Sequence, residues 1–172
     1  MSKAKLKKAL AELSKDGVIE MVTELYDARP EARDYLEYWL DPNPDREFQA
    51  ALEKVDKMFF YSTGKNRTQP SQTSLKRLVK DFSTLVFDSE KIAQLYLHIA
   101  ESHAKWLRQK QKGRGQSEKA VRRNLQLAEE YIVSAQLESV FEIRLERLRK
   151  FIDDVMDLPE FKDRRGWRRF FI

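Results

Sequence analysis

The sequence predicts an all-α protein, a single domain of seven to eight helices packed as αα-hairpins in an irregular bundle or a short superhelical array. Apolar residues recur every three or four positions in one segment after another, which is the period of an amphipathic helix. No run alternates between apolar and polar residues as a half-buried strand would. Almost every Gly and Pro falls between the periodic segments, where helices begin and end.

A length of 172 residues fits one domain, spanning 1–172, with a long loop at about 63–73 and a basic aromatic tail at 159–172. The chain has no Cys, which excludes disulfides and thiolate metal sites. The basic start is followed by ALAELSKDG rather than by an apolar signal-peptide core. No apolar run approaches the length of a bilayer span. We therefore expect a cytoplasmic protein that does not enter a membrane.

The first 43 residues predict three short helices. The first begins after Ser2, the second is capped by Ser14 or Asp16, and the third has Pro30 in its first turn, where a missing N–H costs nothing. The third helix ends at the pair of prolines that follows it. Its expected buried side consists of Tyr35, Leu36, Trp39 and Leu40.

The middle of the chain predicts three longer helices. Asn43 caps the first, which has Pro44 in its first turn and runs to about Ser62. The loop at 63–73 is either a solvated connector or a lid or binding loop. Thr73 and Ser74 are expected to cap the next helix, and a further helix starts again at the FDSEK segment. Two helices joined so tightly should be antiparallel or steeply crossed neighbours.

Residues 117–159 form the longest periodic stretch, and its apolar face changes phase midway. The first stripe ends near Ala135, and the second begins at Leu137, displaced by about 200° around a helix. Either the chain turns near residues 134–136 and forms a hairpin, or one long helix is buried on two sides; we favour the turn. The expected core of the whole domain includes Phe48, Leu52, Val55, Phe82, Ile99, Ile132, Phe141, Leu145 and Leu148.

No motif in the chain indicates catalysis or a bound cofactor. His98 and His103 are five residues apart, whereas two ligands on one helix face need a spacing of three or four. The Asp153, Asp154 and Asp157 cluster has no His or Cys nearby, which is typical of a solvated helix face. GRG at 113–115 lacks the preceding strand and the continuation of a phosphate-binding loop. We therefore expect no enzymatic activity, no cofactor and no metal.

Charge is segregated along the chain, although the net charge is only +5. Residues 16–62 and 124–161 are acidic, and no acidic residue lies between Thr63 and Lys80. Segregation of this kind points to an acidic partner. The candidate residues for binding an anion or a partner are Lys65, Arg67, Lys76, Arg77, Arg122, Arg123, Arg164, Arg165, Trp167, Arg168 and Arg169. In the tail, the arginines either pair with phosphates beside Trp167, or pair with acidic faces of the bundle while the aromatic residues dock as a C-terminal latch.

The motifs ELYDARPEARDYLEYWLDPNP, VRRNL and the terminal RRGWRR occur in this chain together with TSLKRLVKDFSTLVFD. With these motifs the chain resembles an uncharacterised family of small bacterial all-helical proteins, a domain of unknown function. The resemblance covers nearly the whole chain and implies an all-α cytosolic bacterial protein. It implies no activity, cofactor or catalytic residue.

The sequence thus favours a protein-interaction module that binds an unknown protein partner. The alternative is weak, sequence-independent binding of nucleic acid or another polyanion through three basic segments, residues 64–80, 105–124 and 162–169. An enzyme whose site is assembled from scattered residues is the third and least favoured interpretation.

Overall fold

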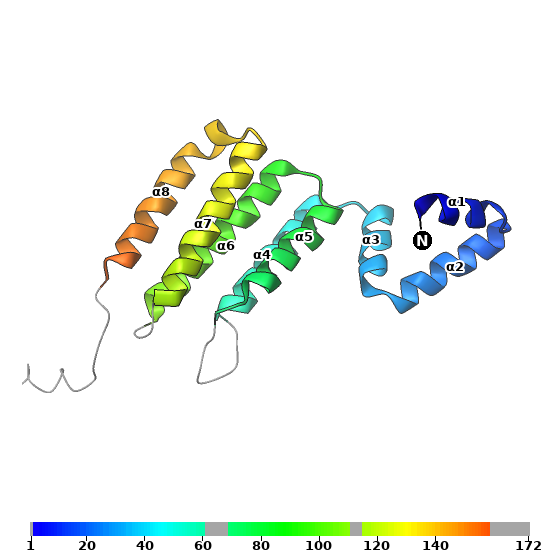
Figure 1. The fold of residues 1–172 in the computed structure, drawn as a ribbon, viewed down its shortest axis with the longest axis horizontal. Coiled ribbons are helices and arrows are strands. Elements are labelled where there is room, and N and C mark those ends of the chain that lie inside the picture. Colours follow the sequence, from blue (N-terminus) through cyan, green and yellow to red (C-terminus); the bar gives the residue numbers. More distant parts are fainter. Residues whose placement is uncertain (1, 61–68, 111–114, 159–172) are drawn as a thin grey trace, which may run out of the picture. The chain divides into compact units, whose positions relative to one another are not determined.

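The computed structural model describes residues 2–60, 69–110 and 115–158, and every regular element in these residues is an α-helix. Eight helices follow one another along the described chain (Figure 1). The predicted all-α class and helix number are therefore confirmed. The chain divides into two compact units, Met1–Asn43 and Pro44–Ile172, and the prediction that both belong to one domain stays a prediction.

The N-terminal unit contains α1 (Lys3–Ala11), α2 (Lys15–Ala28) and α3 (Pro30–Leu40). The hydroxyl oxygens of Ser2 and Ser14 accept backbone N–H bonds at the starts of α1 and α2, so the cap of α2 is Ser14, one of the two predicted candidates. Pro30 is the first residue of α3. The Tyr26 hydroxyl donates to Glu37 Oε1 over 2.6 Å, and the Arg33 guanidinium lies over the Tyr26 ring. These contacts join α2 to α3 as a hairpin.

The N-terminal unit has no buried core, contrary to the sequence prediction. No residue of α1, α2 or α3 is buried, and Tyr35, Trp39 and Leu40 of the expected buried side are exposed while Leu36 is half-buried. Helical periodicity identifies which face of a helix is apolar, but burial also needs a second layer to cover that face. The described residues of this unit do not supply one.

The second unit contains five longer helices, α4 (Pro44–Phe60), α5 (Gln72–Leu85), α6 (Ser89–Gln109), α7 (Gly115–Ser134) and α8 (Glu138–Met156). Figure 1 shows consecutive helices of this unit running in opposite directions, as short connections between neighbours require. The αα-hairpin packing predicted from the sequence is therefore observed.

The α6 helix is the centre of the second unit and packs against α4, α5, α7 and α8. It is the most deeply buried helix, because its apolar residues surround it instead of forming one stripe. Most expected core residues are buried in this unit, and only Leu52 is half-buried. The buried residues of α6 are Ile92, Ala93, Leu95, Leu97, Ile99, Ala100, Ser102, His103, Ala104, Trp106 and Leu107.

The phase change near residue 135 is a turn between two helices, which confirms the favoured prediction. Gln136 has φ 58°, a left-handed conformation. The Leu137 N–H bonds Ile132 O over 3.0 Å and the Gln136 N–H bonds Val133 O over 3.1 Å, the two bonds of a Schellman motif. The helix therefore ends at this point without a Gly or Pro, the breakers that a sequence search relies on.

The start of α5 differs from the prediction. The cap is Ser71 rather than Thr73 or Ser74, and its hydroxyl oxygen accepts the Ser74 N–H over 3.0 Å. The helix begins two or three residues earlier than expected because the polar run offers several residues able to cap it. At α6, Asp88 Oδ1 accepts the backbone N–H groups of Glu90 and Lys91. Across the described residues, no helix combines the length and apolar character needed to cross a membrane.

Candidate interaction surfaces

The N-terminal unit exposes a large set of apolar side chains. Trp39 and Leu40 at the end of α3 are 68% and 72% exposed. Solvent-exposed tryptophan is uncommon, because a large ring gains more than most side chains from burial. The exposed large apolar residues of this unit are Leu6, Leu13, Ile19, Val22, Leu25, Tyr35, Trp39 and Leu40.

The segment that forms α2 and α3 also carries an excess of acidic residues. From residue 15 to 43 the chain has eight Asp or Glu and three Lys or Arg. Arg33 is within 4.0 Å of Asp27. The unit thus combines exposed apolar side chains with an excess of acidic ones, which favours a partner surface that is apolar and basic.

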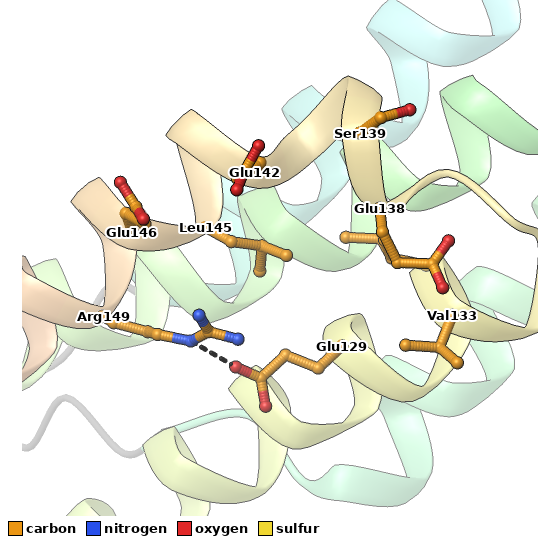
Figure 2. Close-up of a pocket in the computed structure, with 9 residues that line it drawn as sticks. Glu129, Val133, Glu138, Ser139, Glu142, Leu145, Glu146 and Arg149 are labelled. Atoms are coloured by element: carbon orange, nitrogen blue, oxygen red, sulfur yellow. Dashed lines mark hydrogen bonds and ion pairs between the residues drawn. The ribbon is translucent and has the colours of Figure 1, made fainter.

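A groove of about 400 Å³ lies between α7 and α8 in the second unit (Figure 2). The side chains of Leu145 and Ile132 supply its apolar base, and the exposed Val133 lies at one end. At the other end Arg149 Nε donates to Glu129 Oε1 over 2.7 Å, joining the two helices. The complete lining is Glu129, Ile132, Val133, Glu138, Ser139, Glu142, Leu145, Glu146 and Arg149.

Three carboxylates repeat every four residues along the α8 side of the groove. Glu138, Glu142 and Glu146 therefore share one face of the helix. No ion pair joins them to a cation in the described residues. Like charges at this spacing cost about 0.2 to 0.5 kcal/mol per pair, and only Glu138 gains from the positive end of the helix dipole. With Arg149 included, the groove has a formal charge of −3.

The structure describes four of the eleven predicted binding residues. Lys76 and Arg77 are exposed on α5, and Arg122 and Arg123 are exposed on α7. The two helices each pack against α6, so the pairs belong to different neighbours of one central helix. Arg77 forms an ion pair with Asp81 at 3.7 Å. The predicted residues outside the described ranges are Lys65, Arg67, Arg164, Arg165, Trp167, Arg168 and Arg169, and their convergence on one face stays a prediction.

His98 lies between α6 and α4 in a cluster that superficially resembles a catalytic triad. Its Nε2 is 2.9 Å from Asp56 Oδ1 and 3.5 Å from Ser102 Oγ. In a triad the carboxylate and the hydroxyl contact opposite ring nitrogens, so that the imidazole can take the hydroxyl proton while the carboxylate stabilises the imidazolium that forms. Both groups approach the same nitrogen in this cluster, and Ser102 is buried. The arrangement ties α4 to α6 and does not activate the serine.

His103 is buried in the interior and satisfied at both ring nitrogens. Asn124 Nδ2 donates to its Nδ1 over 2.9 Å, and its Nε2 lies 3.1 Å from Gln69 Oε1. Burial, helped by the charge of Lys110, lowers the pKa of His103 to about 4. Sequence reasoning missed both partners, although Asn124 lies at helical spacing between the stripe residues Val121 and Ala128. A polar residue within an apolar stripe was the available signal.

The carboxylates Asp153, Asp154 and Asp157 at the end of α8 form no metal-binding group with other described residues. Asp153 and Asp154 are exposed near the C-terminal end of that helix. Within the described ranges no three His, Asp or Glu residues are placed to hold a metal ion.

Comparisons with known proteins bear on the family and leave the activity open. No curated protein and no solved structure matches the chain. A family model described as a family of unknown function matches residues 1–162. That range includes all eight helices described above. The chain belongs to this family of unknown function, DUF6155.

Proposed function

We propose that this chain is a cytoplasmic protein-interaction module whose N-terminal unit, residues 1–43, docks onto another protein through the apolar side chains of α1, α2 and α3. The observation that carries the proposal is a helical unit in which no residue of α1, α2 or α3 is buried and in which Trp39 and Leu40 are 68% and 72% exposed. Apolar surface concentrated in this way is typical of interaction sites.

The lengths of these helices add to the argument. Helix α1 has 9 residues and α3 has 11, and isolated helices shorter than about 12 to 15 residues are marginal in water. Helices of this size need tertiary packing to persist. A partner that covers the apolar face supplies that packing. Removing this apolar surface from water also stabilises the complex.

The chemistry of the surface selects the partner class. Because α2 and α3 carry an excess of acidic residues beside their exposed apolar ones, the matching surface is a protein face with apolar side chains and Lys or Arg. Trp39 is the expected anchor, since large aromatic side chains at the centre of an interface contribute most of its binding energy.

The test compares the full chain with its Trp39→Ser/Leu40→Ser variant. The partner is isolated on the native protein after nuclease treatment, and amide exchange of residues 3–40 is measured with and without it. We expect fast exchange in the isolated chain, protection when the partner binds, and loss of that binding in the variant. Phe87→Ser is the matched control, because Phe87 is exposed in the second unit and its removal should leave binding unchanged.

Two results would refute the proposal. Slow exchange of residues 3–40 in the isolated monomer would mean that another part of the same chain covers the face. Equal partner binding by the wild-type protein and the double variant would mean that a different surface is used. A partner that proves to be a second copy would appear as a concentration-dependent dimer in ultracentrifugation, lost in the variant, and would support the proposal.

The sequence-independent nucleic-acid binding suggested by the basic segments is the alternative function. Its residues are partly outside the described ranges. It differs from protein docking in one measurable respect, a steep dependence of affinity on salt.

A further inference from the structure

The groove between α7 and α8 is independent of the N-terminal surface and has its own unusual charge. We propose that the C-terminal tail of the same chain, residues 159–172, occupies this groove, with Trp167 over Leu145 and the arginines on either side paired with the glutamates of α8. Three properties support this occupant, namely the charge of the tail, its composition and its reach along α8.

Charge complementarity is the first step. The groove carries four glutamates and one arginine, a formal charge of −3. Residues 159–172 carry five Lys or Arg and two Asp or Glu, a formal charge of +3. Within the groove the Arg149 and Glu129 pair is already formed, so the acidic face that remains is Glu138, Glu142 and Glu146. An arginine forms two parallel hydrogen bonds to a carboxylate, which makes arginine the best-suited cation for such a face.

The composition of the tail matches the apolar part of the groove. The tail has Phe161, Trp167, Phe170 and Phe171 among 14 residues. The groove offers Leu145 and Val133, and Figure 2 shows the Leu145 side chain directed into the space between the two helices. A ring seated there contacts Leu145 and Val133 while its flanking arginines remain at the acidic rim.

The length of the tail determines which of its aromatic residues can reach Leu145. At 1.5 Å per residue, Leu158 lies about 20 Å from Leu145 along α8 and about 30 Å from Glu138. An extended chain advances about 3.4 Å per residue, so Trp167 reaches about 30 Å beyond Leu158, whereas Phe161 reaches only about 10 Å. Trp167 can therefore lie over Leu145, and Phe161 cannot.

The same reach limits which glutamates the arginines can pair with. With the tail antiparallel to α8, Arg164 and Arg165 reach at most about 20 Å and so can contact Glu146, whereas Arg168 and Arg169 reach at most about 35 Å and so can also contact Glu142 and Glu138. In sequence, two arginine pairs flank Trp167, as Glu142 and Glu146 flank Leu145. Attachment to the chain keeps the tail at a millimolar effective concentration, so a weak individual affinity suffices for occupancy.

Cysteine cross-linking of the full chain tests the proposal cleanly because the chain has no native Cys. Val133→Cys with Phe170→Cys should form a disulfide within the monomer about tenfold faster than Thr84→Cys with Phe170→Cys, because only the first pair lies at the groove. Thr84 is exposed on α5, outside the groove. Circular dichroism confirms that each variant is folded.

Charge reversal then identifies the acidic face as the cause. Glu142→Lys/Glu146→Lys in the Val133→Cys/Phe170→Cys background should slow the cross-link to the rate of the Thr84 control. Asp153→Lys/Asp154→Lys is the matched control, because both residues are exposed on the same helix outside the groove, and the fast rate should survive. Equal rates for the two cysteine pairs, or no effect of reversing Glu142 and Glu146, would overturn the proposal. Cross-links that form only between chains would overturn it as well.

Discussion

Asn124 on α7 donates a hydrogen bond from Nδ2 to Nδ1 of His103 on α6, across 2.9 Å in the interior of the second unit. An amide nitrogen only donates, so Nδ1 accepts and the single ring proton resides on Nε2, where it is donated to Gln69 Oε1 over 3.1 Å. The imidazole is thus neutral, and both nitrogens are satisfied without a charge. One buried side chain links α6, α7 and the segment that precedes α5.

Acid should destabilise the protein through His103. Its pKa falls from the ordinary 6.5 to about 4 on folding, so the unfolded state binds the proton more readily. The stability that the neutral ring contributes is fully present above about pH 6.5 and is lost as the pH falls toward 4, by about 3 kcal/mol in all. Denaturant unfolding at several pH values between 4 and 7 measures how the free energy of unfolding changes with pH.

The variant that isolates this effect is His103→Gln, which keeps a donor and an acceptor but does not titrate. Between pH 4 and 6.5 its free energy of unfolding should fall less with decreasing pH than that of the wild-type protein, because the loss due to His103 is absent. His98→Gln, in the half-buried cluster with Asp56, should still lose the stability that depends on His103 as the pH falls. An unchanged slope in His103→Gln would show that another group causes the acid sensitivity.

Replacing Gln136 by Gly should stabilise the protein. Gln136 has φ 58°, and a residue with a Cβ pays about 1 kcal/mol or more for the left-handed conformation that Gly adopts freely. Part of the gain is offset by the greater freedom of Gly in the unfolded chain. We expect a net increase of about 0.5 to 1 kcal/mol in the free energy of unfolding. Gln126→Gly, in the middle of α7, is the control and should lose about 1 kcal/mol.

The sequence predicted the helices well because each is specified locally. Ser2 and Ser14 cap the helices that follow them, and Pro30 begins α3, as their side chains and ring geometry dictate. The turn after α7 was predicted from the phase of the apolar stripe, although no Gly or Pro marks it. Its cause, the left-handed Gln136, could not be predicted, since that conformation is rare for Gln.

The features that could not be predicted depend on contacts between distant parts of the chain. Periodicity placed Trp39 and Leu40 on the apolar face of α3, yet the same pattern describes a buried helix and one that awaits a partner. The groove unites Glu129 and Val133 of α7 with residues of α8, and only the hairpin geometry brings the two helices together at that point. Charge segregation marked residues 124–161 as acidic, and every groove residue lies in that range, but the candidate binding residues were chosen from the basic segments.

Truncating Ile132 should cost far more than truncating Ile143. Ile132 on α7 is fully buried, so Ile132→Ala loses its packing and leaves a cavity, at a cost of about 2 to 5 kcal/mol. Ile143 on α8 is 64% exposed, so Ile143→Ala should change the free energy of unfolding by about 0.5 kcal/mol or less. Denaturant unfolding of both variants measures the difference. Similar losses in the two would contradict the packing of the α7 and α8 hairpin.

The last prediction separates the alternative function from protein interaction. If the basic segments bind nucleic acid, they contact the phosphate backbone, because nothing in the chain resembles a base-reading element. Affinity should then be micromolar or weaker and should fall steeply between about 50 and 200 mM salt. Fluorescence anisotropy with single- and double-stranded DNA and RNA of unrelated sequence measures both quantities.

Charge reversal at Lys65, Arg67, Arg122 and Arg123 should weaken such binding equally for unrelated sequences. The slope of log affinity against log salt should flatten by about one unit for each phosphate that the variant no longer neutralises. Lys54→Glu/Lys57→Glu on α4 is the control, because both lysines are exposed but lie outside the predicted basic segments, and the slope should hardly change. No binding at the lower salt would eliminate the nucleic-acid alternative, since counterion release makes that condition the most favourable one for binding phosphates.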